Sequence, residues 1–147
     1  MLTLQGDSFT CGRSRFADQH PKFPEPTAKI FVKIKFPEVK RLGIAQVDTG
    51  AAYSILETEI ALALGLLDHP GGLRTRVSTR FGTLSGELVW VPLTLIADEG
   101  SSLTLVGTFF VSRDWRGGTF LGYTGLLDRL RIALDAPANL FYFGEED

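Results

Sequence analysis

The stretch Ala45-Gln46-Val47-Asp48-Thr49-Gly50-Ala51-Ala52-Tyr53-Ser54-Ile55-Leu56 places one carboxylate between two apolar runs. The residues before Asp48 have the composition of a buried strand, and Tyr53 to Leu56 predict a second strand. Thr49 and Gly50 follow Asp48 directly, and a glycine without a side chain lets the backbone of a turn approach another chain closely. An ordinary polar turn is one interpretation of this carboxylate, and a functional site is the other.

The amino-acid composition limits the number of domains and the fold class. The chain has 147 residues and is 44% hydrophobic, which suffices for one domain with a sizeable core. Its 16 glycines, seven prolines and many short apolar runs indicate frequent turns between short strands. We therefore predict a single, mostly-β domain.

The charge and the cysteine count exclude several functions. The 15 Lys and Arg residues against 17 Asp and Glu give a net charge of -2, so we expect no nucleic-acid partner. Cys11 is the only cysteine, which excludes an intrachain disulfide and a zinc site built from several cysteines. His20 and His69 lie far apart without metal-ligand spacing, so we predict no metal site.

Other reaction classes also lack their motifs. The glycine pairs Gly71-Gly72 and Gly117-Gly118 are not placed between a strand and a helix as in nucleotide-binding loops, so we expect no cofactor. Neither histidine lies in a motif that would serve a nucleophilic serine. No apolar stretch reaches the roughly 20 residues that span a bilayer, and the first 20 residues lack the features of a signal peptide. We expect a cytoplasmic protein without membrane contact.

The order of apolar and turn residues predicts the elements. Residues 1–25 form an N-terminal arm with one short strand at Met1–Leu4, and residues 26–147 form the domain. Strands are expected at 28–36, 42–47, 53–56, 103–111, 130–134 and 140–143, with a helix at 57–64 and a short helix near 126–130.

A long hairpin is predicted in the middle of the chain. Its arms are residues 73–81 and 84–96, joined at Gly82-Thr83. Arg74, Arg76 and Arg80 share one face of the first arm, which a solvated strand face explains, with contact to a substrate or partner as the alternative.

Three features in sequence order resemble the aspartic proteases. The first is the segment Ala45–Leu56 around Asp48, the second is the hairpin, placed where those proteins carry their flap, and the third is Phe120-Leu121-Gly122 before a short helix. Pepsin-like enzymes carry two such motifs in a chain about twice as long. This chain has one Asp-Thr-Gly and no Asp-Ser-Gly, so over roughly residues 26–143 it is similar to the retropepsin-like proteins. The resemblance implies a closed β-barrel with a flap hairpin and one or two short helices.

A single motif has a chemical consequence. Amide hydrolysis without a metal or a covalent nucleophile needs one group that takes a proton from water and another that gives a proton to the leaving nitrogen. Two neighbouring carboxylates that share one proton meet this need. Since each chain carries one Asp48, the pair can form only across the twofold axis of a homodimer.

The resemblance assigns roles to residues. Asp48, Thr49 and Gly50 would form the catalytic loop, with the Thr49 hydroxyls bracing the two loops. Substrate, an extended peptide, would lie against Ala51, Ala52, Phe81, Gly82, Thr83 and Leu84, while Phe120, Leu121 and Gly122 would support the loop. The expected function is that of an aspartic endopeptidase; the alternative is a retropepsin-like module that binds peptides or assembles partners without efficient cleavage. Gln46, at a usually apolar position, and Tyr123, where retroviral relatives carry an arginine, depart from the family pattern.

Overall fold

The computed structural model describes residues 1–22, 29–67 and 71–146. Within them the chain forms a seven-stranded sheet, a four-stranded sheet and a two-stranded ribbon, which confirms the mostly-β prediction. The seven-stranded sheet consists of β4 (Phe31–Lys35), β5 (Gly43–Val47), β6 (Ser54–Ile55), β7 (Leu73–Thr79), β8 (Gly82–Leu95), β10 (Leu103–Val111) and β11 (Thr119–Leu121).

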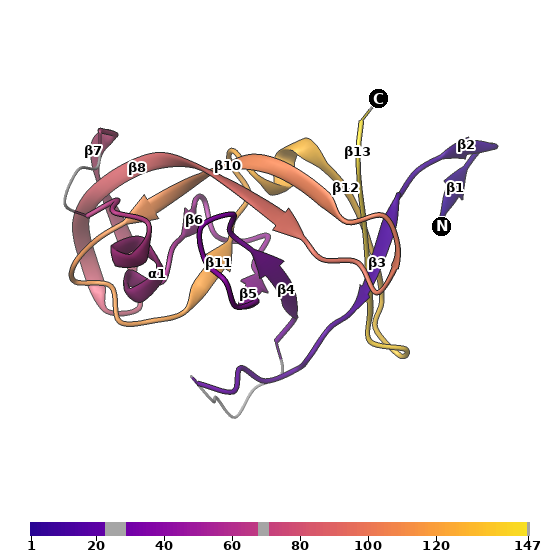
Figure 1. The fold of residues 1–147 in the computed structure, drawn as a ribbon, viewed down its shortest axis with the longest axis horizontal. Coiled ribbons are helices and arrows are strands. Elements are labelled where there is room, and N and C mark those ends of the chain that lie inside the picture. The colour runs from indigo at the N-terminus through magenta and orange to yellow at the C-terminus, as the bar shows by residue number, and fades with distance from the viewer. Residues whose placement is uncertain (23–28, 68–70, 147) are drawn as a thin grey trace.

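The seven-stranded sheet curls so that the pairings of six of its strands form a ring, with β7 outside it. The strand order is β10-β6-β11-β5-β4-β8-β7, and β8 also pairs with β10 along nine residues. Strand β8 can serve three neighbours because it is long: its first half pairs with β7 and its last two residues pair with β4. Figure 1 shows β8 and β10 arching together over the shorter strands.

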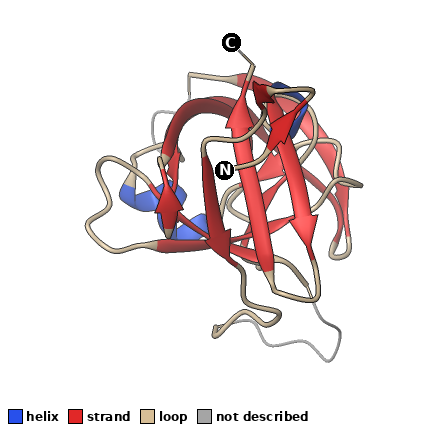
Figure 2. Ribbon diagram, turned by 90° about the vertical axis from the view of Figure 1, so that its right-hand side faces the viewer, coloured by secondary structure: helices blue, strands red, loops and turns tan. Residues whose placement is uncertain are grey.

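The four-stranded sheet lies at the end of the molecule where both termini are found (Figure 1). Its order is β12 (Leu130–Asp135), β13 (Leu140–Glu145), β3 (Gly12–Arg15) and β9 (Glu99–Gly100). Figure 2 views the molecule from this end. The ribbon of β1 (Thr3–Leu4) and β2 (Asp7–Ser8) precedes β3 in the chain.

The sequence prediction for the N-terminal arm was incomplete. A strand was expected at Met1–Leu4, and β1 lies there, but β3 is an integral strand between β13 and β9. The sequence Gly12-Arg13-Ser14-Arg15 has no apolar alternation that would predict a strand. It forms one because its backbone pairs with β13, and Ser14 is buried. The predicted boundary between residues 25 and 26 lies outside the described residues.

The core lies mainly between the two sheets. On β4 the alternation places Val32, Ile34 and Phe36 inward, as predicted, and they pack with Phe109 and Phe141 among others. The predicted helix is α1 (Thr58–Ala63), which buries Ile60 and Ala61. The short helix expected near 126–130 is the 3₁₀ turn η1 (Leu127–Arg129).

The hairpin arms agree with the prediction, but the turn does not. Thr79 pairs with Gly82, so the connection is Arg80-Phe81 and not Gly82-Thr83. The Thr79 hydroxyl accepts the N–H of Phe81 at 3.1 Å and donates to the carbonyl of Gly82 at 2.8 Å. Gly82 then takes a φ of +99°, which suits a glycine directly after a tight turn.

Candidate functional site

Asp48 lies at the end of a strand in the middle of the larger sheet. Strand β5 runs parallel to β11, with Val47 opposite Leu121, and antiparallel to β4. The N–H of Asp48 continues the parallel pairing by donating to the carbonyl of Leu121 at 3.0 Å. Because strands hold the backbone on both sides, the carboxylate is carried by a rigid element.

The loop after Asp48 is compact and open to solvent on one side. The N–H of Gly50 donates to Oδ1 of Asp48 at 3.0 Å, and the N–H of Ala51 donates to the Asp48 carbonyl at 3.2 Å. Thr49, Gly50 and Ala52 are exposed. The tip of the loop is therefore exposed, while the N–H of Gly50 in the same loop holds the carboxylate of Asp48.

The apolar-apolar-glycine element packs against this loop. The N–H of Tyr123 donates to the Ala51 carbonyl at 2.8 Å, and the N–H of Gly122 donates to the buried hydroxyl of Ser54 at 2.8 Å. A Cβ at Gly122 would lie 2.4 Å from both the C and the O of Tyr53, so only glycine fits between the two segments. The structure thus brings Leu121 and Gly122 to the Asp48 loop, and their supporting role remains a prediction.

Ser54 is a residue that sequence reasoning missed. It is fully buried in β6, where its hydroxyl takes the N–H of Gly122. The available signal was a lone hydroxyl inside the apolar run Tyr53–Leu56, since a buried polar group needs a partner.

A cleft of about 320 Å³ connects Asp48 with the hairpin tip. Its apolar wall is formed by Ala51, Ile55, Trp115 and Phe120. Its polar and charged lining comes from both sides of the cleft and consists of Lys29, Gln46, Asp48, Ser78, Thr79 and Arg80.

The hairpin residues that line this cleft differ from those predicted. Phe81, Gly82, Thr83 and Leu84 were expected to face the substrate, whereas Ser78, Thr79 and Arg80 form the described lining. The reason is the shifted turn, which places Arg80 at the tip. Leu84 instead packs against the buried cluster of Ile55, Phe110 and Trp115. Ala52 also lies outside the described lining, next to the exposed loop tip.

Aromatic rings in edge-to-face contact hold the hairpin tip over the cleft. Phe81 meets Trp115 edge to face at 5.5 Å between ring centroids, and Trp115 meets Phe120 at 5.8 Å. Trp115 is 3% exposed, and its indole N–H donates to the carbonyl of Gly118 at 2.9 Å. Sequence reasoning missed Trp115, although a large aromatic side chain often dominates the packing around it.

A second polar cluster joins residues 20–22 to the start of helix α1. Lys22 bridges Glu57 and Glu59 at 2.7 and 2.6 Å, and Nδ1 of the buried His20 accepts the N–H of Lys22 at 2.9 Å. Burial lowers the pKa of His20; Lys22 acts in the same direction and Glu57 opposes them. His20 also meets Phe31 edge to face at 5.5 Å.

The described residues show neither a metal-binding group nor a membrane-spanning helix. Nowhere in 1–22, 29–67 and 71–146 do three His, Cys, Asp or Glu side chains gather to hold an ion. Over the same residues, no helix has the length and apolar character to cross a membrane. His69 lies outside the described residues.

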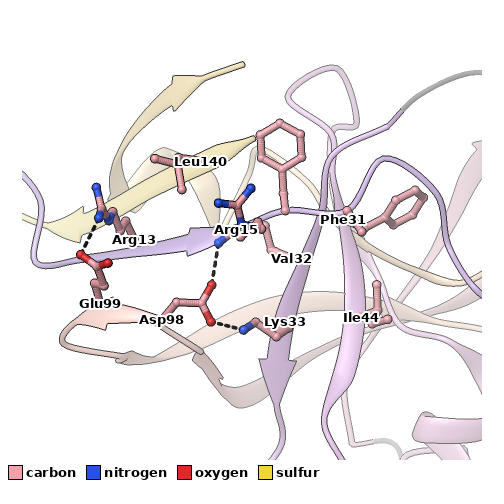
Figure 3. Close-up of a pocket in the computed structure, with 11 residues that line it drawn as sticks. Arg13, Arg15, Phe31, Val32, Lys33, Ile44, Asp98, Glu99 and Leu140 are labelled. Atoms are coloured by element: carbon pink, nitrogen blue, oxygen red, sulfur yellow. Dashed lines mark hydrogen bonds and ion pairs between the residues drawn. The ribbon is translucent and has the colours of Figure 1, made fainter. Parts of the chain in front are cut away.

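A larger recess, of about 610 Å³, lies between the two sheets (Figure 3), and Asp48 is not among its lining residues. Its charged residues bind each other: Arg13 pairs with Glu99, and Lys33 pairs with Asp98, which also accepts the N–H of Arg15. The hydrogen bond from Lys33 lowers the pKa of Asp98. These contacts join β3 and β4, so the recess is lined by contacts that hold the two sheets together.

Comparisons with known proteins agree with this geometry. No protein-family model matches the chain, and no curated protein sequence matches it. Among solved structures, a retropepsin-like aspartic protease from Rickettsia conorii superposes with a TM-score of 0.54 at 18% identity, covering 90% of each chain. The retroviral protease-like domain of Ddi1 from Leishmania major gives a TM-score of 0.53 at 19% identity, covering 81% of this chain and 94% of that one. The chain has a retropepsin-like fold.

Proposed function

We propose that the protein is a homodimeric aspartic endopeptidase that hydrolyses internal peptide bonds with water activated between the Asp48 carboxylates of two chains. The observation that carries this proposal is the position of Asp48. It ends a central strand, lines a cleft below a hairpin tip, and stands beside an exposed loop. The protease-like kind is supported by the fold of both structural neighbours.

The chemistry requires a second carboxylate close to the first. A lone carboxylate can take a proton from water, but it cannot at the same time donate one to the leaving nitrogen. Two carboxylates in contact share one proton, since both cannot ionise readily, and so provide a base and an acid together. A second copy of this chain supplies the partner if the two loops meet about a twofold axis.

The exposed face around the loop suits that meeting. Thr49 and Gly50 are exposed to solvent. Tyr123, whose N–H is hydrogen-bonded to the same loop, is 54% exposed. In the proposed dimer Thr49 braces the two loops and Tyr123 lies at the edge of the contact.

The substrate would bind extended between the loop and the hairpin. An extended peptide can hydrogen-bond through its main chain and place alternate side chains in pockets. The hairpin tip would then act as a flap that excludes water and opens for turnover. Phe81, Gly82, Thr83 and Leu84 would move with it.

The test is a comparison of wild type with Asp48→Asn. Oligomeric mass is measured by light scattering, and cleavage of a pool of extended peptides is followed by mass spectrometry with and without pepstatin. We expect a cleaving, pepstatin-sensitive dimer, and a loss of about 10²–10⁴-fold in rate for Asp48→Asn, since general acid–base catalysis typically contributes that much. Asp7→Asn, in the exposed ribbon, is the matched control and should cleave normally.

The other outcomes point elsewhere. A dimer that binds peptides and never cleaves them would favour the peptide-binding or assembly module. A monomer, or cleavage that survives Asp48→Asn, would contradict the proposal.

A further inference from the structure

Lys29 stands beside Asp48 because of the strand register. Strands β4 and β5 pair antiparallel with Phe31 opposite Gln46, and the N–H of Val47 continues the pairing by donating to the Ile30 carbonyl at 2.9 Å. One further step places Lys29 opposite Asp48, on the same face of the sheet as Phe31 and Gln46. Both side chains line the cleft, in agreement with this register.

Arg80 reaches the same cleft from the hairpin. It is the first residue of the turn, and its guanidinium lies over the ring of Phe81 at 5.1 Å. Phe81 in turn packs on the buried Trp115. Arg80 is therefore positioned by its contact with Phe81, which packs on Trp115 in the wall of the cleft.

The described lining of the cleft carries two cations and one carboxylate, namely Lys29, Arg80 and Asp48. The same lining includes the amide of Gln46 and the hydroxyls of Ser78 and Thr79, which can hydrogen-bond to a charged oxygen. In the proposed dimer two Asp48 carboxylates share one proton, which further reduces the negative charge of the cleft. Lysine and arginine carry three and five N–H donors, so Lys29 and Arg80 can bind a substrate carboxylate beside the contacts that they already make. Such a lining favours an anionic side chain over an apolar one.

We propose that the cleft selects peptides with an Asp or Glu side chain close to the scissile bond, recognised by Lys29 and Arg80. This inference rests on the proposed endopeptidase function and names its substrate class. A carboxylate that meets a cation under a closed hairpin gains a charge-assisted hydrogen bond in a water-poor site. The twofold axis repeats Lys29 and Arg80 on the other side of the scissile bond, so an acidic residue is accepted on either side.

The first experiment measures the preference directly. A pool of extended peptides of mixed sequence is digested by the wild-type dimer, and the cleavage sites are read by mass spectrometry. One cleaved sequence is then made with Glu, Gln or Lys at the enriched position. We expect kcat/KM for the Glu peptide to exceed that for the Gln peptide by about tenfold or more, as a hydrogen bond to a charged group provides. The Lys peptide should be the poorest substrate.

Variants assign the preference to the two cations. Arg80→Gln and Lys29→Gln should each lower the ratio of kcat/KM for the Glu peptide to kcat/KM for the Gln peptide by about tenfold, whatever change each makes to the overall rate. Arg80→Lys should restore most of the preference, because it keeps the charge at the tip. Arg76→Gln in β7 and Lys35→Gln at the end of β4 remove the same kinds of charge from exposed positions outside the cleft lining and should leave the preference intact.

The outcomes separate this inference from the proposed function. Equal cleavage of the Glu and Gln peptides, or a preference that survives both Arg80→Gln and Lys29→Gln, overturns the inference and leaves the endopeptidase standing. If no peptide is cleaved, the endopeptidase proposal fails. Binding then decides the inference: fluorescein-labelled Glu and Gln peptides are titrated against wild type and Asp48→Asn by anisotropy, and equal affinities overturn it.

Discussion

Replacing Gly122 with alanine should both destabilise the fold and disturb the loop that carries Asp48. A Cβ there would lie 2.4 Å from the C and O atoms of Tyr53 and 2.7 Å from the N of Ser54. Ordinary contacts begin at 3.4 Å, so the segments must separate by about 1.0 Å (3.4 − 2.4). All three neighbouring atoms are backbone, and no side chain can rotate away to make room.

The expected cost follows from the contacts that must move. Overpacking of a well-packed site costs about 1–3 kcal/mol. Separation of the two segments also weakens the hydrogen bonds from Gly122 to Ser54 and from Tyr123 to Ala51, each contributing about 0.5–1.5 kcal/mol. A more restricted unfolded chain returns about 0.4–1 kcal/mol. We expect a net loss of about 2–4 kcal/mol, or a fall in Tm of about 6–12 °C for a domain of this size.

Gly50→Ala is the matched control for this prediction. Within the described residues, a Cβ at Gly50 would have one neighbouring atom, Oδ1 of Asp48 at 3.4 Å, which is an ordinary contact, and Gly50 does not have a positive φ. The free energy of unfolding should therefore change by less than about 1 kcal/mol. Urea unfolding of both variants is followed at one protein concentration, because the midpoint of a dimer depends on concentration.

Activity completes the comparison. A displacement of about 1 Å in the loop that carries Asp48 should lower kcat about 10²-fold in Gly122→Ala. If Gly122→Ala were as stable and as active as wild type, the packing of the apolar-apolar-glycine element against the Asp48 loop would be refuted.

Two further predictions concern His20 and the tryptophans. The folded-state pKa of His20 lies below its unfolded value of about 6.5, so its contribution to stability is complete above that pH and is lost as the pH falls through the lowered pKa. His20→Asn keeps an acceptor for the N–H of Lys22 and should lose less stability than wild type between pH 7.5 and 5; an equal loss in urea unfolding would contradict this. Trp90→Phe leaves only Trp115, 3% exposed, whereas Trp115→Phe leaves only Trp90, 59% exposed. Acrylamide should therefore quench Trp115→Phe much more strongly than Trp90→Phe, and similar quenching would show that the hairpin does not cover Trp115.

Local patterns were sufficient for most of the elements. Strand β10 agrees with the prediction at both ends, and α1 differs by one residue at each end. These elements depend on apolar periodicity and on end signals such as Gly65, whose φ of +72° ends the helix. Such signals lie within a few residues of the structure that they determine.

Other features depend on contacts that the local sequence does not contain. Strand β3 exists because β13 offers it a partner more than 120 residues later in the chain. The hairpin turn is set by the hydroxyl of Thr79, which competes with the more familiar turn signal of Gly82-Thr83. Lys29 and Arg80 line the same cleft because a strand register places one of them there and contacts between aromatic rings place the other.

The structure explains the glycine at position 122 but not the glycine at position 50. The backbone of Tyr53 and Ser54 leaves no room for a side chain at Gly122, so this chain alone accounts for that glycine. Nothing in the described part of the chain crowds a Cβ at Gly50, and its backbone conformation is open to other residues. If Gly50→Ala folds normally but fails to dimerise or to cleave, the requirement for glycine comes from a second chain or from the substrate. That result would locate the missing half of the site at the exposed tip of the Asp48 loop, while a fully active Gly50→Ala dimer would place the contact elsewhere.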